Sequence, residues 1–211
     1  MATGIGFVDL AGFTALTEAH GDNEAADMAE LFAAMAQAEA ASGDRLVKSI
    51  GDAVLLQSPS GKQIVEFATR LMRRCGSEPS FPLARGGAHC GPIVARGGDV
   101  FGSTVNVAAR IAAQAHGGQL LISHDVRSEI DDDTAVVDLG EFELRNVADL
   151  VHLFEVPLGL EAGPAGVDPV CRMRVERDRA AGRLRHHGHD YWFCSLTCAE
   201  RFASHPEAFA P

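Results

Sequence analysis

Residues 7–14 read FVDLAGFT, and this stretch decides how the first part of the chain folds. Apolar side chains flank Asp9 on both sides, so the run is strand-like and the carboxylate is not an ordinary solvated one. An unpaired buried carboxylate costs several kcal/mol, and Asp9 therefore needs cations nearby. The Gly-containing turn that follows leads toward a helix, where free backbone N–H groups bind phosphate. The stretch predicts a strand with a cation-binding carboxylate beside a phosphate-binding turn.

A second carboxylate, Asp52, follows in the stretch VKSIGDAV. Residues 45–50 and 53–57 read as two strands that meet at a Gly-Asp turn, a common hairpin signal. If Asp9 and Asp52 lie on neighbouring strands, they can share two Mg²⁺ ions about 3.5–4 Å apart, an arrangement that promotes in-line displacement at phosphorus. Taken alone, Asp52 is better explained as an ordinary turn residue. For Lys48 the alternative is an exposed strand lysine.

The stretch DVFGSTVNVAAR, residues 99–110, places two polar side chains on one helix face. Asn106 and Arg110 are four residues apart, so both point the same way, and small apolar residues occupy the opposite face. Asn106 can orient a ribose, and Arg110 can neutralise charge that develops on a reacting phosphate. The ordinary alternative is a solvated helix face, and Asp99 has the same turn explanation as Asp52.

Strand-like and helical segments alternate through the first three-quarters of the chain, with hairpins among them. This order predicts an α+β fold, a ferredoxin-like mixed sheet with packed helices, rather than a purely parallel sheet. The expected strands are residues 4–10, 45–50, 53–57, two pieces within 83–102, 119–122, 135–138, 141–144 and 151–156. The expected helices are residues 63–74, 103–116 and one that begins at Asp22 or Asn23 with the apolar stripe Met28, Leu31, Phe32 and Met35.

The composition limits the partners of the chain. Its 211 residues are 46% hydrophobic, which suffices for one large core and a smaller second unit. The 29 acidic against 18 basic side chains give a net charge of -11, which argues against nucleic acid and anionic membrane as main partners. The N-terminus lacks the features of a signal peptide, and no run of about 18 apolar residues occurs, so we expect a cytoplasmic protein.

The C-terminal part of the chain carries a cysteine cluster, Cys171, Cys194 and Cys198. In a reducing compartment such a cluster indicates a metal rather than disulfides. Cys194 and Cys198 can lie one helical turn apart and bind a soft or borderline metal, Zn or Cu, with Cys171 from a preceding knuckle. The Pro- and Gly-rich residues 158–167 read as a linker between domains at 1–157 and 168–211. The sequence does not decide the fourth ligand. The alternatives are an open coordination position, a carboxylate such as Asp168, or one of the histidines His186, His187, His189 and His205.

Read together, FVDLAGFT, VKSIGDAV and DVFGSTVNVAAR, with the following AAQAHGGQLLIS, resemble the class III nucleotidyl cyclase catalytic domain. The resemblance covers roughly residues 3–157. The tail FELRNVADLVHLFEV is similar to the closing strands of that family, with Asn146 where a Gly is usual. The resemblance implies the nucleotide cyclase fold and a catalytic centre formed between two subunits, and therefore a homodimer with two equivalent sites.

The resemblance also implies a role for each motif residue. Two Mg²⁺ or Mn²⁺ ions serve each site, and the phosphates lie on the Gly-containing turn. The implied roles are metal binding for Asp9, Asp52 and the Leu10 carbonyl, phosphate binding for Gly12, Phe13 and Thr14, purine recognition for Lys48 and Asp99, ribose binding for Asn106 and transition-state stabilisation for Arg110.

Hydrogen-bond chemistry favours ATP over GTP as the substrate. Adenine offers an acceptor at N1 and a donor at N6, which suit the Lys48 ammonium and the Asp99 carboxylate. Guanine in the same pose presents N1–H to Lys48 and O6 to Asp99, two repulsive contacts. Mismatched buried polar groups give strong discrimination, so the sequence predicts conversion of ATP to cyclic AMP and pyrophosphate.

The C-terminal stretches DPVCRMRV, YWFCSLTC and RFASHPEAF resemble the YHS/TRASH family of small metal-binding domains, with Arg172 in place of the usual Gly after the first Cys. Only eight residues precede Asp9, so we expect built-in control to come from this unit, with metal occupancy changing dimer geometry and cyclase rate. The leading hypothesis is an adenylate cyclase. The alternatives are a nucleotide-binding dimer without activity and a metal-binding signalling module on an oligomerisation platform.

Overall fold

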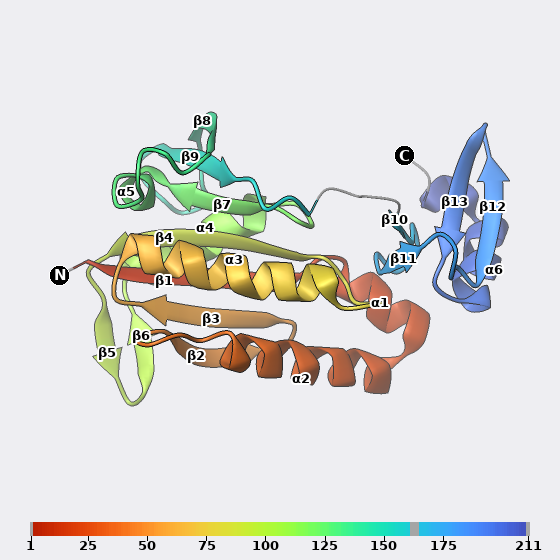
Figure 1. Ribbon diagram of the computed structural model, residues 1–211, viewed down its shortest axis with the longest axis horizontal. Coiled ribbons are helices and arrows are strands. Elements are labelled where there is room, and N and C mark those ends of the chain that lie inside the picture. The colour runs from red at the N-terminus through yellow and green to blue at the C-terminus, as the bar shows by residue number, and fades with distance from the viewer. Residues whose placement is uncertain (1, 161–164, 210–211) are drawn as a thin grey trace.

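The computed structural model describes residues 2–160 and 165–209, and its larger domain is built on one seven-stranded mixed sheet (Figure 1). Neighbouring strands are antiparallel except β4 and β7, which are parallel. The predicted α+β class and mixed sheet are confirmed. The strand order is β2 (Arg45–Ile50), β3 (Ala53–Ser58), β1 (Thr3–Leu10), β4 (Ala84–Gly91), β7 (Leu120–Ser123), β9 (Val151–Val156) and β8 (Val137–Phe142).

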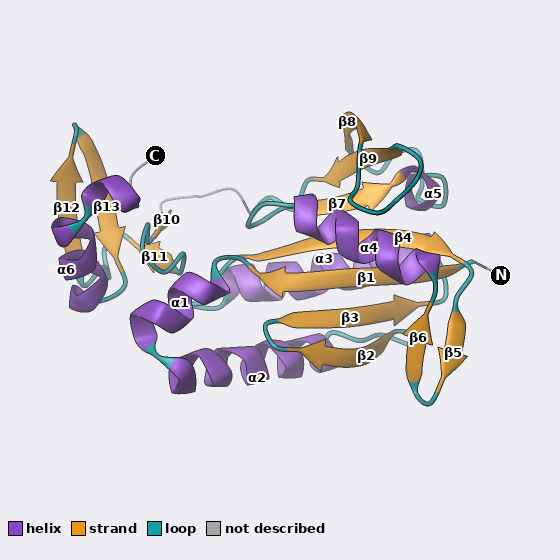
Figure 2. Cartoon of the chain, turned by 180° about the vertical axis from the view of Figure 1, so that it is seen from behind, coloured by secondary structure: helices purple, strands orange, loops and turns teal. Residues whose placement is uncertain are grey.

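Helices cover both faces of this sheet, as Figures 1 and 2 show from opposite sides. The apolar stripe of α3 (Gly61–Ser77) is buried, and the Ser60 hydroxyl caps this helix by accepting from the Gln63 N–H. On the α2 helix (Asp22–Ala38), Phe32 and Met35 are buried as expected, but Leu31 is 42% exposed. The opposite face is covered by α4 (Ser103–Gln114). The remaining helices of this domain are α1 (Phe13–His20) and the short α5 (His124–Arg127).

Two segments differ from the strand pattern expected from the sequence. The strands expected at 135–138 and 141–144 form one strand, β8, whose pairing with β9 shifts between Asp138 and Gly140. The glycine-rich segment before α4 forms a small hairpin of β5 (Val94–Arg96) and β6 (Asp99–Phe101). Asn146, where the family usually has Gly, adopts φ 61°, a left-handed conformation that Asn tolerates better than most residues.

The C-terminal unit, residues 165–209, packs at one end of the larger domain. Residues 161–164 of the predicted linker lie outside the described residues, and its last three form a strand. Leu16 of α1 and Ala25 of α2 share a buried cluster with Val170, Phe193 and Phe202 of the unit. Its elements are β10 (Ala165–Val167), β11 (Arg174–Glu176), β12 (Gly182–His186), β13 (His189–Phe193), α6 (Leu196–Ser204) and a 3₁₀ turn, Pro206–Ala208.

Across the described ranges, no helix combines the length and apolarity that a membrane crossing needs.

Gly87 on β4 sets the distance between the sheet and α4. A Cβ at this position would lie 2.6 Å from the Ala112 Cα, which is backbone and cannot swing away. We expect Gly87→Ala to lower the free energy of unfolding by about 1–3 kcal/mol, because α4 must shift off the sheet. Chemical denaturation measures the change. Gly166→Ala is the control, because its Cβ would meet no described atom nearer than 3.7 Å; equal stability of the two variants would contradict the packing.

Candidate active site and metal centre

The pairing of β1 with β3 brings Asp9 and Asp52 together. Asp9 is the register partner of Ala53, and the Leu10 N–H donates to the Asp52 carbonyl at 3.1 Å. Both carboxylates are half-buried, and burial raises the pKa of each above its ordinary value. The charge of Asp52 raises the pKa of Asp9 further. Two crowded, partly desolvated carboxylates form a site that favours cations.

Arg85 is a third charged member of this site that the sequence analysis missed. It lies opposite Asp9 on β4, and its Nε donates to Asp9 Oδ1 at 2.6 Å. Its guanidinium also donates to the Ala115 carbonyl at 3.2 Å, at the end of α4. The only sequence signal for Arg85 was a cationic residue in a strand, ARGGAHCG, made mostly of small residues. The same kind of signal singled out Asp9. Arg85 partly offsets the crowding by lowering the pKa of Asp9.

The turn after β1 leads into α1 through a glycine. Gly12 adopts φ 77° at the N-cap of α1, and no side chain caps the helix, so its first N–H groups lack that partner. Phe13 packs partly into the core, whereas Thr14 is exposed. The uncapped start of α1 therefore follows Asp9 closely in the chain.

Lys48 and Asp99 form an ion pair between β2 and β6, with Lys48 Nζ 2.5 Å from Asp99 Oδ2. The hydrogen bond from Lys48 lowers the pKa of Asp99, and Asp99 Oδ1 accepts the Val100 N–H at 2.8 Å. A cationic donor and an anionic acceptor are thus fixed side by side. This is the pattern that a purine edge with neighbouring acceptor and donor groups requires.

Asn106 and Arg110 lie exposed on α4, one turn apart. Asn106 precedes Ala115, the residue that contacts Arg85, by nine positions. At 1.5 Å per residue this places Asn106 roughly 13 Å along the helix from the Arg85 contact beside Asp9. Within one chain the carboxylates and Asn106 are therefore well separated.

The three cysteines of the C-terminal unit converge, and all are reduced. Their Sγ atoms lie 3.4 Å apart for Cys171 and Cys194, and 3.8 Å apart for Cys194 and Cys198. Hydrogen bonds from Cys171 and then Cys194 lower the pKa of Cys198, whereas a hydrogen bond with Cys194 raises the pKa of Cys171. The three sulfurs are thus close enough to influence one another's ionisation.

A fourth side chain, His20, joins this cluster from the larger domain. Its Nε2 lies 3.5 Å from Cys194 Sγ and 3.8 Å from Cys198 Sγ. The sequence analysis missed His20, because 174 positions separate it from Cys194 and no local pattern links them. His20 is the last residue of α1, and its position beside the cysteines follows only from the packing of the two domains.

The side chains that the sequence left open as fourth ligands are not members of the group formed by His20 and the three cysteines. The buried Asp168 lies beside the Cys194 thiol, but its carboxylate accepts the Val170 N–H and the Cys194 N–H, both at 2.8 Å, and so organises the knuckle. His186 and His187 gather near Glu207 in a separate, mostly exposed group. The four-residue cluster with His20 is the more enclosed of the two.

Two family models match the chain. The adenylate and guanylate cyclase catalytic domain matches residues 2–154, and the YHS domain matches residues 167–211. The first match spans most of the chain, so the chain belongs to the adenylate and guanylate cyclase family and carries a YHS domain after the cyclase domain.

Similar curated proteins include two from Mycobacterium tuberculosis. An uncharacterized protein of Mycobacterium tuberculosis (strain H37Rv) is 38% identical over 154 residues, which are 72% of this chain and 40% of that protein. A pH-sensitive adenylate cyclase of M. tuberculosis (strain CDC 1551) is 33% identical over 160 residues, 74% of this chain and 40% of that protein. The chain spans about two fifths of the length of these relatives.

Solved structures confirm the predicted nucleotide cyclase fold. An adenylate cyclase from Trypanosoma brucei in its monomeric state gives a TM-score of 0.67 at 21% identity, covering 74% of this chain and 90% of that one. The adenylyl cyclase CyaB from P. aeruginosa gives a TM-score of 0.61 at 21% identity, covering 74% and 93%.

Asp52→Asn tests the electrostatic strain at the carboxylate pair. Because burial raises the pKa of Asp52, the ionised carboxylate destabilises the fold at pH 7, and this penalty fades as the pH falls through the raised pKa. The isosteric amide removes the charge, so the metal-free variant should gain stability, by at most about 1 kcal/mol because water still screens the group. Thermal melting in EDTA at pH 7 and pH 4 measures the difference, which should shrink at the lower pH.

The exposed Asp178 supplies the control for this test, because Asp178→Asn removes a charge from a solvated position. A loss of stability in Asp52→Asn at pH 7, or a gain that grows at pH 4, would contradict the strained pair.

Proposed function

We propose that this protein is an adenylate cyclase, which converts ATP to 3′,5′-cyclic AMP and pyrophosphate at sites shared between two copies of the chain. The observation that carries the proposal is the juxtaposition of Asp9 and Asp52 on paired strands, beside a turn of free backbone donors. The Lys48–Asp99 pair supports the choice of ATP.

The donor set at the carboxylate pair fits Mg²⁺ or Mn²⁺. Two carboxylates and the adjoining Leu10 carbonyl are hard oxygen ligands, which these ions prefer, and the raised pKa values of both acids indicate a need for positive charge. When bound, two such ions lower the pKa of the ribose 3′-hydroxyl and neutralise charge on the triphosphate.

The residues of the chain bind and orient the rest of the nucleotide. The N–H groups of the turn at Gly12 and the Arg85 guanidinium hold phosphate oxygens. Lys48 donates to adenine N1, and Asp99 accepts from N6. On α4, Asn106 orients the ribose so that its 3′-oxygen faces the α-phosphorus, and Arg110 neutralises charge as that bond forms.

A homodimer follows from the separation of the two residue sets. Asn106 lies too far along α4 from Asp9 for both to contact one ribose-phosphate unit within a single chain, so the second set comes from a partner copy. Large apolar side chains support an interface: Ile50 beside the Asp52 turn and Val94 and Phe101 on the β5–β6 hairpin are half-exposed or more.

The first test is a side-by-side assay of the purified chain with ATP and GTP in Mg²⁺ or Mn²⁺. We expect cyclic AMP from ATP, a kcat/KM for GTP at least about 10-fold lower, and a loss of about 100-fold or more in Asp52→Asn. In Lys48→Ala the preference for ATP should shrink, because the donor to N1 is gone. Faster cyclisation of GTP would overturn the base assignment. No cyclic nucleotide from either substrate would favour a silent nucleotide-binding dimer.

Mixing two inactive variants tests the shared site. Asp9→Asn/Asp52→Asn lacks the carboxylates, and Asn106→Ala/Arg110→Ala lacks the α4 residues. A mixed dimer regains one intact site of two, so an equimolar mixture should recover about a quarter of the parent activity. Mixing either variant with itself is the control, and no recovery in the mixed sample would contradict a site built from two chains.

The YHS domain is proposed to bind Zn or Cu through Cys171, Cys194 and Cys198 and to modulate the cyclase. The observation that supports it is the convergence of the three thiols, with Cys194 Sγ 3.4 Å from Cys171 Sγ and 3.8 Å from Cys198 Sγ.

A further inference from the structure

We propose that His20 of the cyclase domain is the fourth ligand of the metal ion bound by Cys171, Cys194 and Cys198, so that one ion joins the two domains. The inference rests on the proposed thiolate site and adds a ligand that the YHS domain itself does not contain. It makes the metal centre an interdomain clamp.

The distances match the edges of a tetrahedral site. Zinc binds sulfur at about 2.3 Å and imidazole nitrogen at about 2.0–2.1 Å, which sets tetrahedral edges near ~3.8 Å between sulfurs and ~3.5 Å between sulfur and nitrogen. Here the sulfur pairs lie 3.4 and 3.8 Å apart, and His20 Nε2 lies 3.5 and 3.8 Å from two of the sulfurs. All four ligand atoms fall within 4.8 Å of one another. Four of the six edges of the ligand tetrahedron therefore lie close to the values that a bound zinc ion requires.

The donor set and its burial indicate a closed, structural site. Cys171 and Cys198 are fully buried, and the His20 side chain is 11% exposed. Three thiolates and one imidazole are a common set for structural zinc, whereas catalytic zinc keeps an open position for water. Zn²⁺ is therefore the ion that this geometry favours.

Neighbouring groups orient the ligands on both sides. Asp168 holds the backbone around Cys171 and Cys194 through its carboxylate. On the far side of the imidazole, Glu24 Oε1 lies 3.7 Å from His20 Nδ1. A carboxylate behind the ring favours the tautomer with a proton on Nδ1, which leaves Nε2 free to bind metal.

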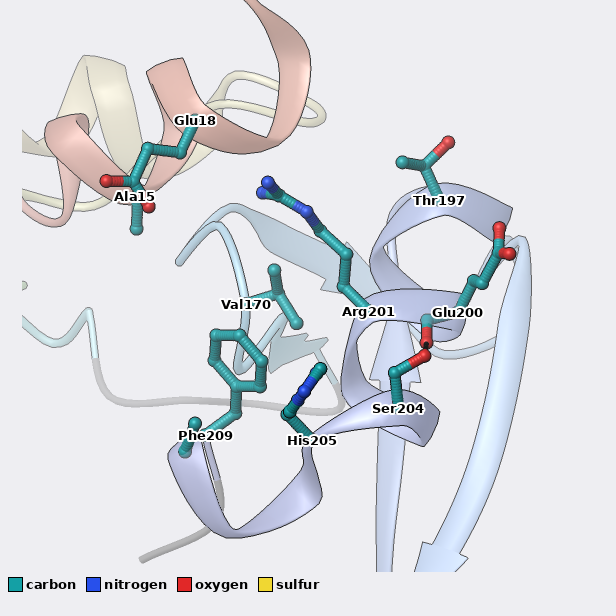
Figure 3. A pocket seen from close by; sticks show the side chains of 10 residues that line it. Ala15, Glu18, Val170, Thr197, Glu200, Arg201, Ser204, His205 and Phe209 are labelled. Carbon is teal, nitrogen blue, oxygen red and sulfur yellow. Dashed lines mark hydrogen bonds between the residues drawn. The ribbon is translucent and has the colours of Figure 1, made fainter.

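The simpler explanation is that His20 only packs at the domain seam. The seam has an apolar part, where Leu16 meets Val170 and Phe202. Beside it, however, a cavity of about 570 Å³ separates α1 from α6, and Figure 3 shows Arg201 projecting into this space toward α1. Apolar packing therefore closes only part of the seam, and it does not explain an imidazole nitrogen directed at two sulfurs.

Two structural connections link the proposed metal site to the turn at Gly12. The α1 helix begins after Gly12 and ends at His20, so an ion bound by His20 fixes the far end of the helix that carries the turn. Arg172, next to the ligand Cys171, packs against Gly12, where a Cβ would lie 2.6 Å from the Arg172 Cβ. Arg172 holds φ 64°, a strained conformation for a residue other than Gly. Metal loading should therefore order residues 11–20.

The test compares His20→Asn with His189→Asn in the full chain. His189 is an exposed histidine of the YHS domain and serves as the matched control. After removal of metal under reducing conditions, each protein is loaded with Zn²⁺ for X-ray absorption and with Co²⁺ for visible spectroscopy. Hydrogen exchange of residues 11–20 is measured with and without Zn²⁺.

We expect three sulfurs and one imidazole in the parent and in His189→Asn. In His20→Asn the imidazole signal should be replaced by oxygen, and the Zn²⁺ affinity should fall by about 10-fold or more. Zn²⁺ should protect residues 11–20 in the parent but not in His20→Asn. Both results are independent of cyclase activity.

Two outcomes separate the inference from the site on which it rests. If Cys171→Ser/Cys194→Ser/Cys198→Ser binds Zn²⁺ as tightly as the parent, the thiolate site itself is wrong. If that variant loses the metal while His20→Asn keeps the same spectra and affinity as the parent, the thiolate site stands and the interdomain ligand is overturned.

Discussion

The active site depends on one structural constraint, the antiparallel pairing of β1 with β3. This pairing brings Asp9 and the turn residue Asp52 together at one end of the sheet, where burial raises the pKa of both. The fold thus keeps two carboxylates in a state that is unfavourable without cations, a common feature of sites that bind metal and phosphate. Arg85, on the strand at the other side of β1, compensates only part of that charge.

The α1 helix connects the candidate active site with the cysteine cluster. Its N-terminus follows the Gly12 turn that we propose to bind phosphate, its middle buries Leu16 against the YHS domain, and its last residue, His20, faces the cysteine cluster. A helix of two turns transmits displacement as a nearly rigid rod, because its backbone hydrogen bonds resist bending. If the proposed metal binds there, a displacement at the end of α1 has a direct mechanical path to the turn at Gly12.

The sequence predicted those parts of the molecule that local chemistry determines. A carboxylate in an apolar strand, a Gly-containing turn and the α4 polar pair each carry their own signal, so Asp9, Gly12 and Asn106 were singled out without the fold, and their roles stay predictions. Arg85 and His20 were missed because their roles arise from register and domain packing, which bring together residues far apart in sequence. The two strands expected around residue 140 form one strand. Gly140 looks like a strand break in the sequence, but the strand continues through it with a shift in its pairing with β9.

The carboxylate pair is tested most directly by electron paramagnetic resonance of the full chain with Mn²⁺ and a non-cyclising ATP analogue. The account predicts two spin-coupled Mn²⁺ ions about 3.5–4 Å apart at each site, with the coupling lost in Asp52→Asn. A single uncoupled ion that binds equally well to Asp52→Asn would show that the nucleotide alone holds the metal, and would contradict the role assigned to Asp9 and Asp52.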